Sequence, residues 1–208
     1  MTTLYLIRHS KPLKVNNTFN NDNLQIQNEK QSLSLEGEQI AQNKLNNTEL
    51  DNIDILFSSS YVRTIQTAKY LAEKNNLEIN IVSGLGERKF GISSWNELPE
   101  DFEIKQFLDE NYKIGDGESQ KEVRDRMYFT ILEILNKNKN KRIAIVSHGT
   151  AISFLLSKWC DIEIKEDKIK YSYNGKVLLH NYFDYCETFK LEFDEKNKLI
   201  NIQNIKLD

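Results

Sequence analysis

The stretch that decides the fold is Thr3-Leu4-Tyr5-Leu6-Ile7-Arg8-His9-Ser10. An apolar, β-favouring run ends abruptly in an arginine and a histidine, which is typical of a buried parallel strand that delivers polar groups to a sheet edge. The pattern recurs far along the chain in Arg142-Ile143-Ala144-Ile145-Val146-Ser147-His148-Gly149. Ligands of open α/β sheets bind beyond the carboxyl ends of the strands. We therefore expect Arg8, His9 and His148 at the mouth of one crevice.

The rest of the chain alternates between helical and strand-like patterns. Helices are expected from Ser34 to about Leu45, from the Ser58-Ser59-Ser60 run to about Glu73, and over residues 97–112, 118–136 and 150–159. Strands are expected over residues 53–57 and 77–82, with a terminal hairpin formed by 188–193 and 199–202. This alternation predicts a three-layer α/β/α sandwich with a mainly parallel central sheet, in a single domain spanning residues 1–208.

Residues 11–31 are rich in asparagine and read as a long loop. Loops of that length are usually functional or mobile. Because this one leaves directly from His9, a role in covering the substrate is one hypothesis. The other is that the asparagines reflect a composition bias, since they recur throughout the chain.

Composition excludes several classes of protein. The formal charge of −3 and a pI near 5.8 argue against a partner that is nucleic acid or an anionic membrane. From the sequence we expect neither a membrane-spanning segment nor a signal peptide. Cys160 and Cys186 lack the spacing of a zinc site or disulfide framework, so a reducing cytoplasm is the expected location. A monomer and a homodimer both remain open.

Two further polar side chains follow predicted strands. Arg63 falls in the first turn of a helix, where a cation opposes the helix dipole, and a bound anion would resolve that conflict. Glu87 lies in a glycine-punctuated loop, residues 84–91, that lacks the third glycine of a dinucleotide fingerprint. Arginines offer forked donors to phosphate oxygens, and a neutral imidazole is a competent nucleophile toward phosphorus.

Several motifs together resemble one family. They are Leu6-Ile7-Arg8-His9, Ser59 with Arg63-Thr64-x-Gln66-Thr67-Ala68, Glu87-x-x-Phe90-Gly91, Gly117-Glu118-Ser119 and Ser147-His148-Gly149. In order and spacing they resemble the histidine phosphatase superfamily, also called phosphoglycerate-mutase-like, over about residues 4–152. Each motif alone is weak, but five in register are specific.

The resemblance implies a role for each matching residue. His9 would attack the substrate phosphorus and become a phosphohistidine, while Arg8 and Arg63 hold the phosphate oxygens. His148 and the amide of Gly149 would complete the pocket. Glu87 would protonate the leaving alkoxide and then assist water. The scheme needs no metal and no cofactor, and it implies a small phosphorylated substrate as partner.

The chain departs from the family pattern after His9. Ser10, Lys11 and Pro12 stand where the family usually has glycine, glutamate or glutamine, and threonine or serine. Ser10 would either add a hydroxyl to the phosphate pocket or narrow it, and Lys11 would either pair with an anionic substrate or be an exposed loop lysine. Asn16 and its neighbour are candidates for a substrate-binding asparagine.

Three functions remain open at this level. The first is a phosphatase of small phosphorylated metabolites. The second is a phosphoglycerate-type mutase; the chain lacks the longer insertion of the mutases, which favours hydrolysis. The third is a catalytically idle phosphoryl-binding regulatory module, which would need only the arginines, whereas His9, Glu87 and His148 are all present.

Overall fold

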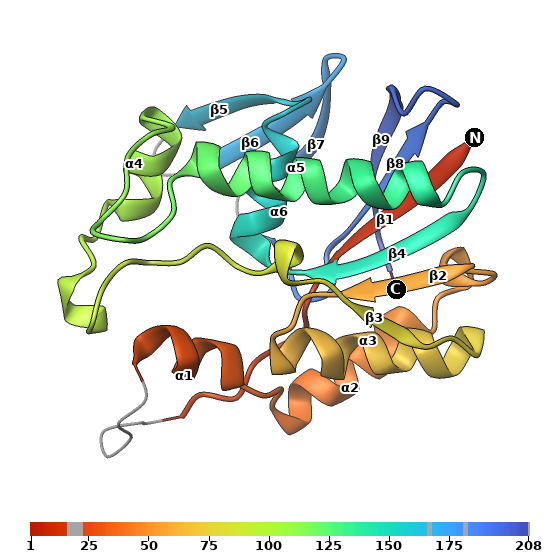
Figure 1. Ribbon diagram of the computed structural model, residues 1–208, viewed down its shortest axis with the longest axis horizontal. Coiled ribbons are helices and arrows are strands. Elements are labelled where there is room, and N and C mark those ends of the chain that lie inside the picture. The colour runs from red at the N-terminus through yellow and green to blue at the C-terminus, as the bar shows by residue number, and fades with distance from the viewer. Residues whose placement is uncertain (16–22, 166–167, 181–182, 208) are drawn as a thin grey trace.

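A six-stranded sheet forms the centre of the computed structural model, which describes residues 1–15, 23–165, 168–180 and 183–207 (Figure 1). Its strands lie in the order β3-β2-β4-β1-β8-β9. They are β1 (Thr2–Arg8), β2 (Ile55–Ser58), β3 (Ile79–Ile81), β4 (Arg142–Ser147), β8 (Thr188–Phe193) and β9 (Leu199–Ile205). The first four of that order are mutually parallel, whereas β8 and β9 add antiparallel at one edge. The predicted mainly parallel sheet and terminal hairpin are confirmed.

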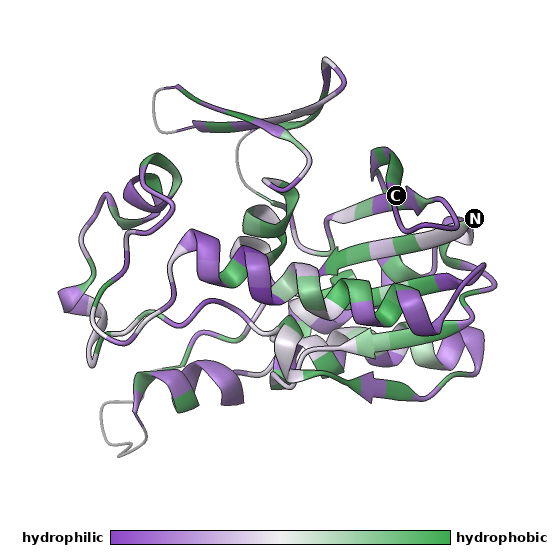
Figure 2. Ribbon diagram, turned by 45° about the horizontal axis from the view of Figure 1, so that its top comes forward, coloured by the Kyte–Doolittle hydropathy of each residue, from purple (hydrophilic) through white to green (hydrophobic). Residues whose placement is uncertain are grey.

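Helices cover both faces of this sheet, because alternate side chains of the strands point to opposite sides. Leu4 and Leu6 pack in the core beneath α5 (Gln120–Lys137) and α6 (Gly149–Leu156). Tyr5 and Ile7 pack in the core beneath α2 (Leu35–Leu45) and α3 (Val62–Asn75). Hydropathy alternates along α5 in Figure 2, in keeping with its one buried face. The predicted three-layer sandwich is confirmed.

The structure shortens one predicted helix and adds another. The predicted helix over residues 97–112 is only α4 (Phe102–Leu108), preceded by the single turn η3 (Trp95–Glu97). Pro99 explains the late start, because the residue before a proline is pushed out of the helical region, and Leu98 is extended. The predicted loop over residues 11–31 contains α1 (Leu24–Lys30), begun by an Asn23 cap on Ile26. Only Leu24 of that helix is buried, so its sequence carries no apolar stripe.

A second, three-stranded antiparallel sheet was missed from the sequence. It consists of β5 (Asp161–Lys165), β6 (Lys168–Tyr173) and β7 (Lys176–His180). Its β6–β7 hairpin turns at Asn174-Gly175, both with positive φ, and an Asn-Gly pair between strands is a strong hairpin signal. The remaining short turns are η1 (Thr48–Leu50) and η2 (Ser83–Leu85). Within the described ranges, no helix is long and apolar enough to cross a membrane.

Candidate active site

The two histidines meet at the carboxyl edge of the central sheet. β1 and β4 pair in parallel with Arg8 opposite Ser147, so His9 and His148 each follow the last residue of neighbouring strands. The His9 backbone N–H donates to the Ser147 carbonyl at 2.9 Å, which extends the ladder by one residue. The ring centroids lie 5.2 Å apart, and both rings are buried. The predicted convergence of the two strand ends is therefore present.

Arg63 bridges these two rings. It sits in the first turn of α3, which follows β2, and its side chain is buried. Its Nε donates to His9 Nε2 at 3.1 Å and one terminal nitrogen donates to His148 Nδ1 at 3.2 Å. The other terminal nitrogen donates to the Asn28 carbonyl on α1. A guanidinium only donates, so each of these imidazole nitrogens presents a lone pair.

This contact assigns the proton of His9 to the opposite nitrogen. His9 Nδ1 lies 2.7 Å from the Ser10 carbonyl, which only accepts, so Nδ1 carries the hydrogen. Burial, reinforced by the charges of Arg63 and Arg8, holds the pKa of His9 well below its usual value. His9 is thus a neutral imidazole whose Nε2 lone pair faces a guanidinium. That is the form in which an imidazole acts as a nucleophile.

His148 is held in the complementary tautomer. Its Nε2–H donates to Ser59 Oγ at 2.8 Å, while Nδ1 accepts from Arg63. Ser59 Oγ also contacts Thr64 Oγ1 at 2.7 Å, and the Tyr61 ring packs against the imidazole at 4.4 Å. Burial and the positive charge of Arg63 lower the pKa of His148 well below its usual value. Sequence reasoning found His148 and used Ser59 as a helix-cap candidate and motif residue, whereas α3 is preceded by Tyr61 at the cap position, a residue that the sequence gave no role.

Arg8 lies at the outer side of this cluster. A terminal nitrogen donates to the Phe183 carbonyl, and the guanidinium lies over the Tyr185 ring at 4.9 Å. Its Nε is buried without a hydrogen-bond partner among the described residues. A Cβ on Gly149 would lie 3.2 Å from this Nε, so glycine lets the start of α6 approach the arginine closely. The structure thus places Arg8 beside the predicted Gly149 amide.

Glu87 caps the amino end of α6. Its carboxylate accepts from the N–H groups of Ala151 at 2.9 Å and Thr150 at 3.4 Å, and from the N–H of Arg88 at 2.9 Å. A carboxylate at this end is favoured by the helix dipole and by its unpaired amides. Since α6 begins immediately after His148, this cap brings Glu87 to the same edge as the histidines.

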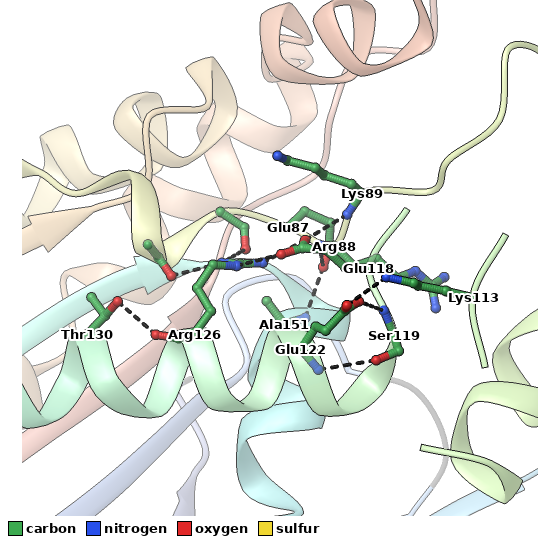
Figure 3. A network of polar contacts seen from close by, with 12 residues as sticks. Glu87, Arg88, Lys89, Lys113, Glu118, Ser119, Glu122, Arg126, Thr130 and Ala151 are labelled. Atoms are coloured by element: carbon green, nitrogen blue, oxygen red, sulfur yellow. Dashed lines mark hydrogen bonds and ion pairs between the residues drawn. The ribbon is translucent and has the colours of Figure 1, made fainter. Parts of the chain in front are cut away.

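A clamp formed by Arg126 and Glu118 fixes the loop that carries Glu87 (Figure 3). Arg126 of α5 donates to the carbonyls of Gly84 at 2.8 Å and Gly86 at 3.2 Å. Its other nitrogens donate to both Glu118 oxygens, at 2.8 and 2.9 Å, and Glu118 in turn accepts from the Lys89 N–H at 3.0 Å. The loop is therefore held on both sides of Glu87. The sequence placed Glu118 at a helix start and gave Arg126 no role.

The structure gives Ser10 and Lys11 partners on the scaffold, and their substrate-binding roles stay predictions. Ser10 is fully buried, its hydroxyl donates to the Gly37 carbonyl at 2.6 Å, and its N–H donates to Thr67 Oγ1 at 3.0 Å. These partners on α2 and α3 hold the serine against the scaffold. Lys11 is paired with Glu36 on α2. Asn16 lies outside the described residues. Among the described residues, no three His, Cys, Asp or Glu side chains gather as a metal site would require.

Comparison with known proteins agrees with this geometry. The model of the histidine phosphatase superfamily (branch 1) matches residues 4–195. A probable phosphoglycerate mutase GpmB of Salmonella arizonae is 30% identical over 165 residues, covering 76% of this chain and 74% of that protein.

Two solved structures share the fold at low sequence identity. A phosphoserine phosphatase of Entamoeba histolytica, crystallised as a mutant with phosphoserine, has a TM-score of 0.66 at 22% identity and covers 98% of this chain and 97% of its own. A mycobacterial glucosyl-3-phosphoglycerate phosphatase with inorganic phosphate has a TM-score of 0.70 at 16% identity, with 99% and 98% covered.

Proposed function

Since this chain belongs to the histidine phosphatase superfamily, we propose that it is a phosphatase that hydrolyses small phosphorylated metabolites through a phosphohistidine on His9. The observation that carries the proposal is the bridge from His9 through Arg63 to His148. In this bridge the neutral imidazole of His9 directs its Nε2 lone pair at the buried guanidinium of Arg63. A module that only binds phosphoryl groups needs the arginine but not the set tautomer of His9.

The first half-reaction follows from these contacts. The phosphate displaces the direct contact between Arg63 and His9, so the guanidinium binds its oxygens and Nε2 faces phosphorus. Nε2 forms a bond to phosphorus while the bond from phosphorus to the ester oxygen breaks. Arg8, Arg63, His148 and the Gly149 amide stabilise the charge on the non-bridging oxygens, which lowers the barrier most where that charge is largest.

Glu87 completes the proton balance. In its acid form it gives a proton to the leaving ester oxygen, which departs as an alcohol. As a carboxylate it then takes a proton from water, whose oxygen attacks the phosphohistidine and releases inorganic phosphate and free His9. The hydrogen bonds from Thr150, Ala151 and Arg88 keep this carboxyl group at the edge where the leaving oxygen must lie. In this scheme side chains and backbone N–H groups stabilise the charge of the phosphate.

A second candidate is a phosphoglycerate-type mutase, which the name of the Salmonella relative favours. A mutase must retain a doubly phosphorylated intermediate, which calls for cationic side chains beyond the first phosphate. Among the described residues that line the pocket beside Arg8, no other cation is present. This favours hydrolysis. The monomeric or homodimeric state and the cytoplasmic location stay predictions.

The test is phosphate release from phenyl phosphate, measured for the native protein and for His9→Ala. Release by the native protein and its loss in the variant are expected. Conversion of 3-phosphoglycerate to 2-phosphoglycerate that depends on a bisphosphoglycerate primer, without net phosphate release, would instead identify a mutase. Binding of inorganic phosphate without turnover of either ester would identify the idle module.

A further inference from the structure

A pocket of about 310 Å³ opens beside the phosphate end of the site. Arg8, Gly149 and Thr150 form part of its wall, and the same residues border the histidine cluster. A phosphoryl group at His9 therefore has this pocket next to it. Glu87 itself lines another hollow, with Tyr61 and Arg126, and reaches this pocket's wall through Thr150, whose N–H donates to it at 3.4 Å. The pocket thus adjoins both the phosphate end and, through Thr150, the residue proposed to serve the leaving oxygen, so the body of the ester can lie in it.

Aromatic rings make up much of the remaining wall. Phe107 comes from α4, Tyr171 from β6 of the small sheet, and Phe183 from the segment before β8. The Tyr171 hydroxyl is hydrogen-bonded to Ser153, so it does not require a hydrogen bond from a ligand. The rings of Tyr171 and Phe183 lie edge to face at 5.9 Å, which packs them against each other. The wall thus offers apolar surface to a ligand.

Glu103 supplies the charge in this part of the pocket. Among the described lining residues, Arg8 and Glu103 are the charged ones, and Arg8 belongs to the phosphate end. The Glu103 carboxylate is anchored by Arg88 at 2.9 Å. Arg88 is itself buried and packs against the rings of Phe90 and Phe102, each 4.8 Å from its guanidinium carbon.

Arg88 does not offer its charge to a ligand in this pocket. One terminal nitrogen donates to Glu103 and the other to the Gln106 amide oxygen, and the side chain does not line the pocket. A ligand therefore meets the carboxylate of this pair rather than the guanidinium. Apart from Arg8, which the first phosphate occupies, the described lining residues offer no cation to a carboxylate or second phosphate on the leaving group. Glu103 would repel such a group, although Arg88 offsets part of that repulsion.

We propose that this pocket receives the leaving group and selects phosphate monoesters whose alcohol has an apolar or aromatic body without negative charge, with Glu103 as the residue that disfavours anionic ones. The proposal rests on the proposed phosphatase function. It deepens that function, because phosphoglycerates become poor substrates and esters of aromatic or aliphatic alcohols become good ones.

The test measures binding separately from turnover. Benzylphosphonate and 3-phosphonopropionate carry the same phosphonate group on an aromatic and an anionic body, and neither can be hydrolysed at the phosphorus–carbon bond. Calorimetry on the native protein is expected to show benzylphosphonate binding at least about tenfold more tightly, the scale of one well-fitted apolar group. Glu103→Gln keeps an acceptor for Arg88. Because it removes the repulsion of the anionic body, it is expected to reduce the ratio of the two dissociation constants, 3-phosphonopropionate over benzylphosphonate, about fivefold. Glu100→Gln, an exposed neighbour outside this pocket, is the matched control and should leave the ratio unchanged.

The outcomes test the selectivity of the pocket and the phosphatase activity separately. Equal binding, or tighter binding of 3-phosphonopropionate, overturns the selectivity even if the protein releases phosphate from phenyl phosphate. Tighter binding of benzylphosphonate without phosphate release from phenyl phosphate supports the pocket's selectivity and contradicts the phosphatase. If Glu103→Gln fails to fold, the order of binding to the native protein still decides the selectivity.

Discussion

The phosphate end and the leaving-group end of this site are built in different ways. The phosphate end consists of residues that directly follow β1 and β4 or begin α3, and its imidazoles are buried, neutral and joined by Arg63. The leaving-group end is assembled from α4, the small sheet and the segment before β8. The residues that act on every phosphate ester thus follow the strands of the central sheet. The residues proposed to discriminate between esters come from α4, the small sheet and the segment before β8.

The largest effect is expected at the phosphate end, from His9→Ala. Loss of the nucleophile should lower kcat by about 10⁴-fold or more for every ester, because no other group takes its place. Phosphate release from phenyl phosphate is the measurement. His180→Ala on β7, an exposed histidine, is the matched control and should leave the rate unchanged. A His9→Ala protein with more than a tenth of native activity would contradict the role of His9.

Arg63→Gln should follow in size. One lost donor to the transition-state oxygens lowers the rate by about 10²–10³-fold, and the effect should be the same for aromatic and aliphatic esters. The variant also removes a charge that depresses the pKa of His9, so that pKa should rise. Steady-state kinetics on two esters and histidine NMR titration check both points. A loss confined to one ester would place Arg63 at the leaving-group end instead.

The clamp on the Glu87 loop predicts a smaller loss. Arg126→Gln frees the carbonyls of Gly84 and Gly86, so Glu87 is less well placed, and kcat should fall about tenfold, with little change in KM. Arg124→Gln on the same helix is the control, since Arg124 pairs with Glu110 away from this loop. Equal losses in the two variants would mean that destabilisation of α5, rather than placement of Glu87, is being measured.

The buried neutral histidines also predict a dependence of stability on pH. Their pKa values are lower in the folded than in the unfolded chain, so their contribution is complete above about pH 6.5 and is lost as pH falls below it. Each histidine should reduce the free energy of unfolding by up to about 1.4 kcal/mol per pH unit in that window. Urea unfolding between pH 6.5 and 5.5 measures it. If the free energy of unfolding of a His9→Ala, His148→Ala double variant depends on pH as steeply as that of the native protein, these histidines are not the cause.

The smallest effect is expected for Lys11→Ala. Lys11 pairs with Glu36 at the surface, and such pairs contribute at most about 1 kcal/mol to stability. The kcat/KM for any phosphate ester should stay within about twofold of native. A larger loss that depends on the charge of the ester would instead support the substrate-binding role that the sequence suggested for this lysine.

The two ends also differ in how far sequence alone predicts them. His9, His148 and Arg63 sit at strand and helix ends, and hydrophobic periodicity locates those ends, so their meeting at one edge follows from topology. The direction in which a side chain points cannot be derived from topology in this way. Ser10 adjoins the nucleophile in sequence, yet its hydroxyl bonds to Gly37 on α2.

Specificity was less predictable, because it depends on packing between elements distant in the chain. Glu103 is held in position by its ion pair with Arg88. Tyr171 is positioned by the small sheet, whose lysine-rich strands resemble a polar tail in the sequence. The local signals for that sheet were the Asn174-Gly175 turn and the apolar–polar alternation over 161–164 and 168–173. The partnership of Arg126 with the Glu87 loop joins residues about forty positions apart and has no local signal at all.

The most direct test of this account is to identify the residue that carries the phosphoryl group during turnover. The native protein is mixed with phenyl phosphate, quenched in base, which preserves phosphohistidine, and digested for mass spectrometry. The account predicts one phosphoryl group on the peptide that contains His9 and none on the peptide that contains His148. Phosphate release with the label on any other residue, or with no labelled intermediate in a quench fast enough to precede its hydrolysis, would contradict it.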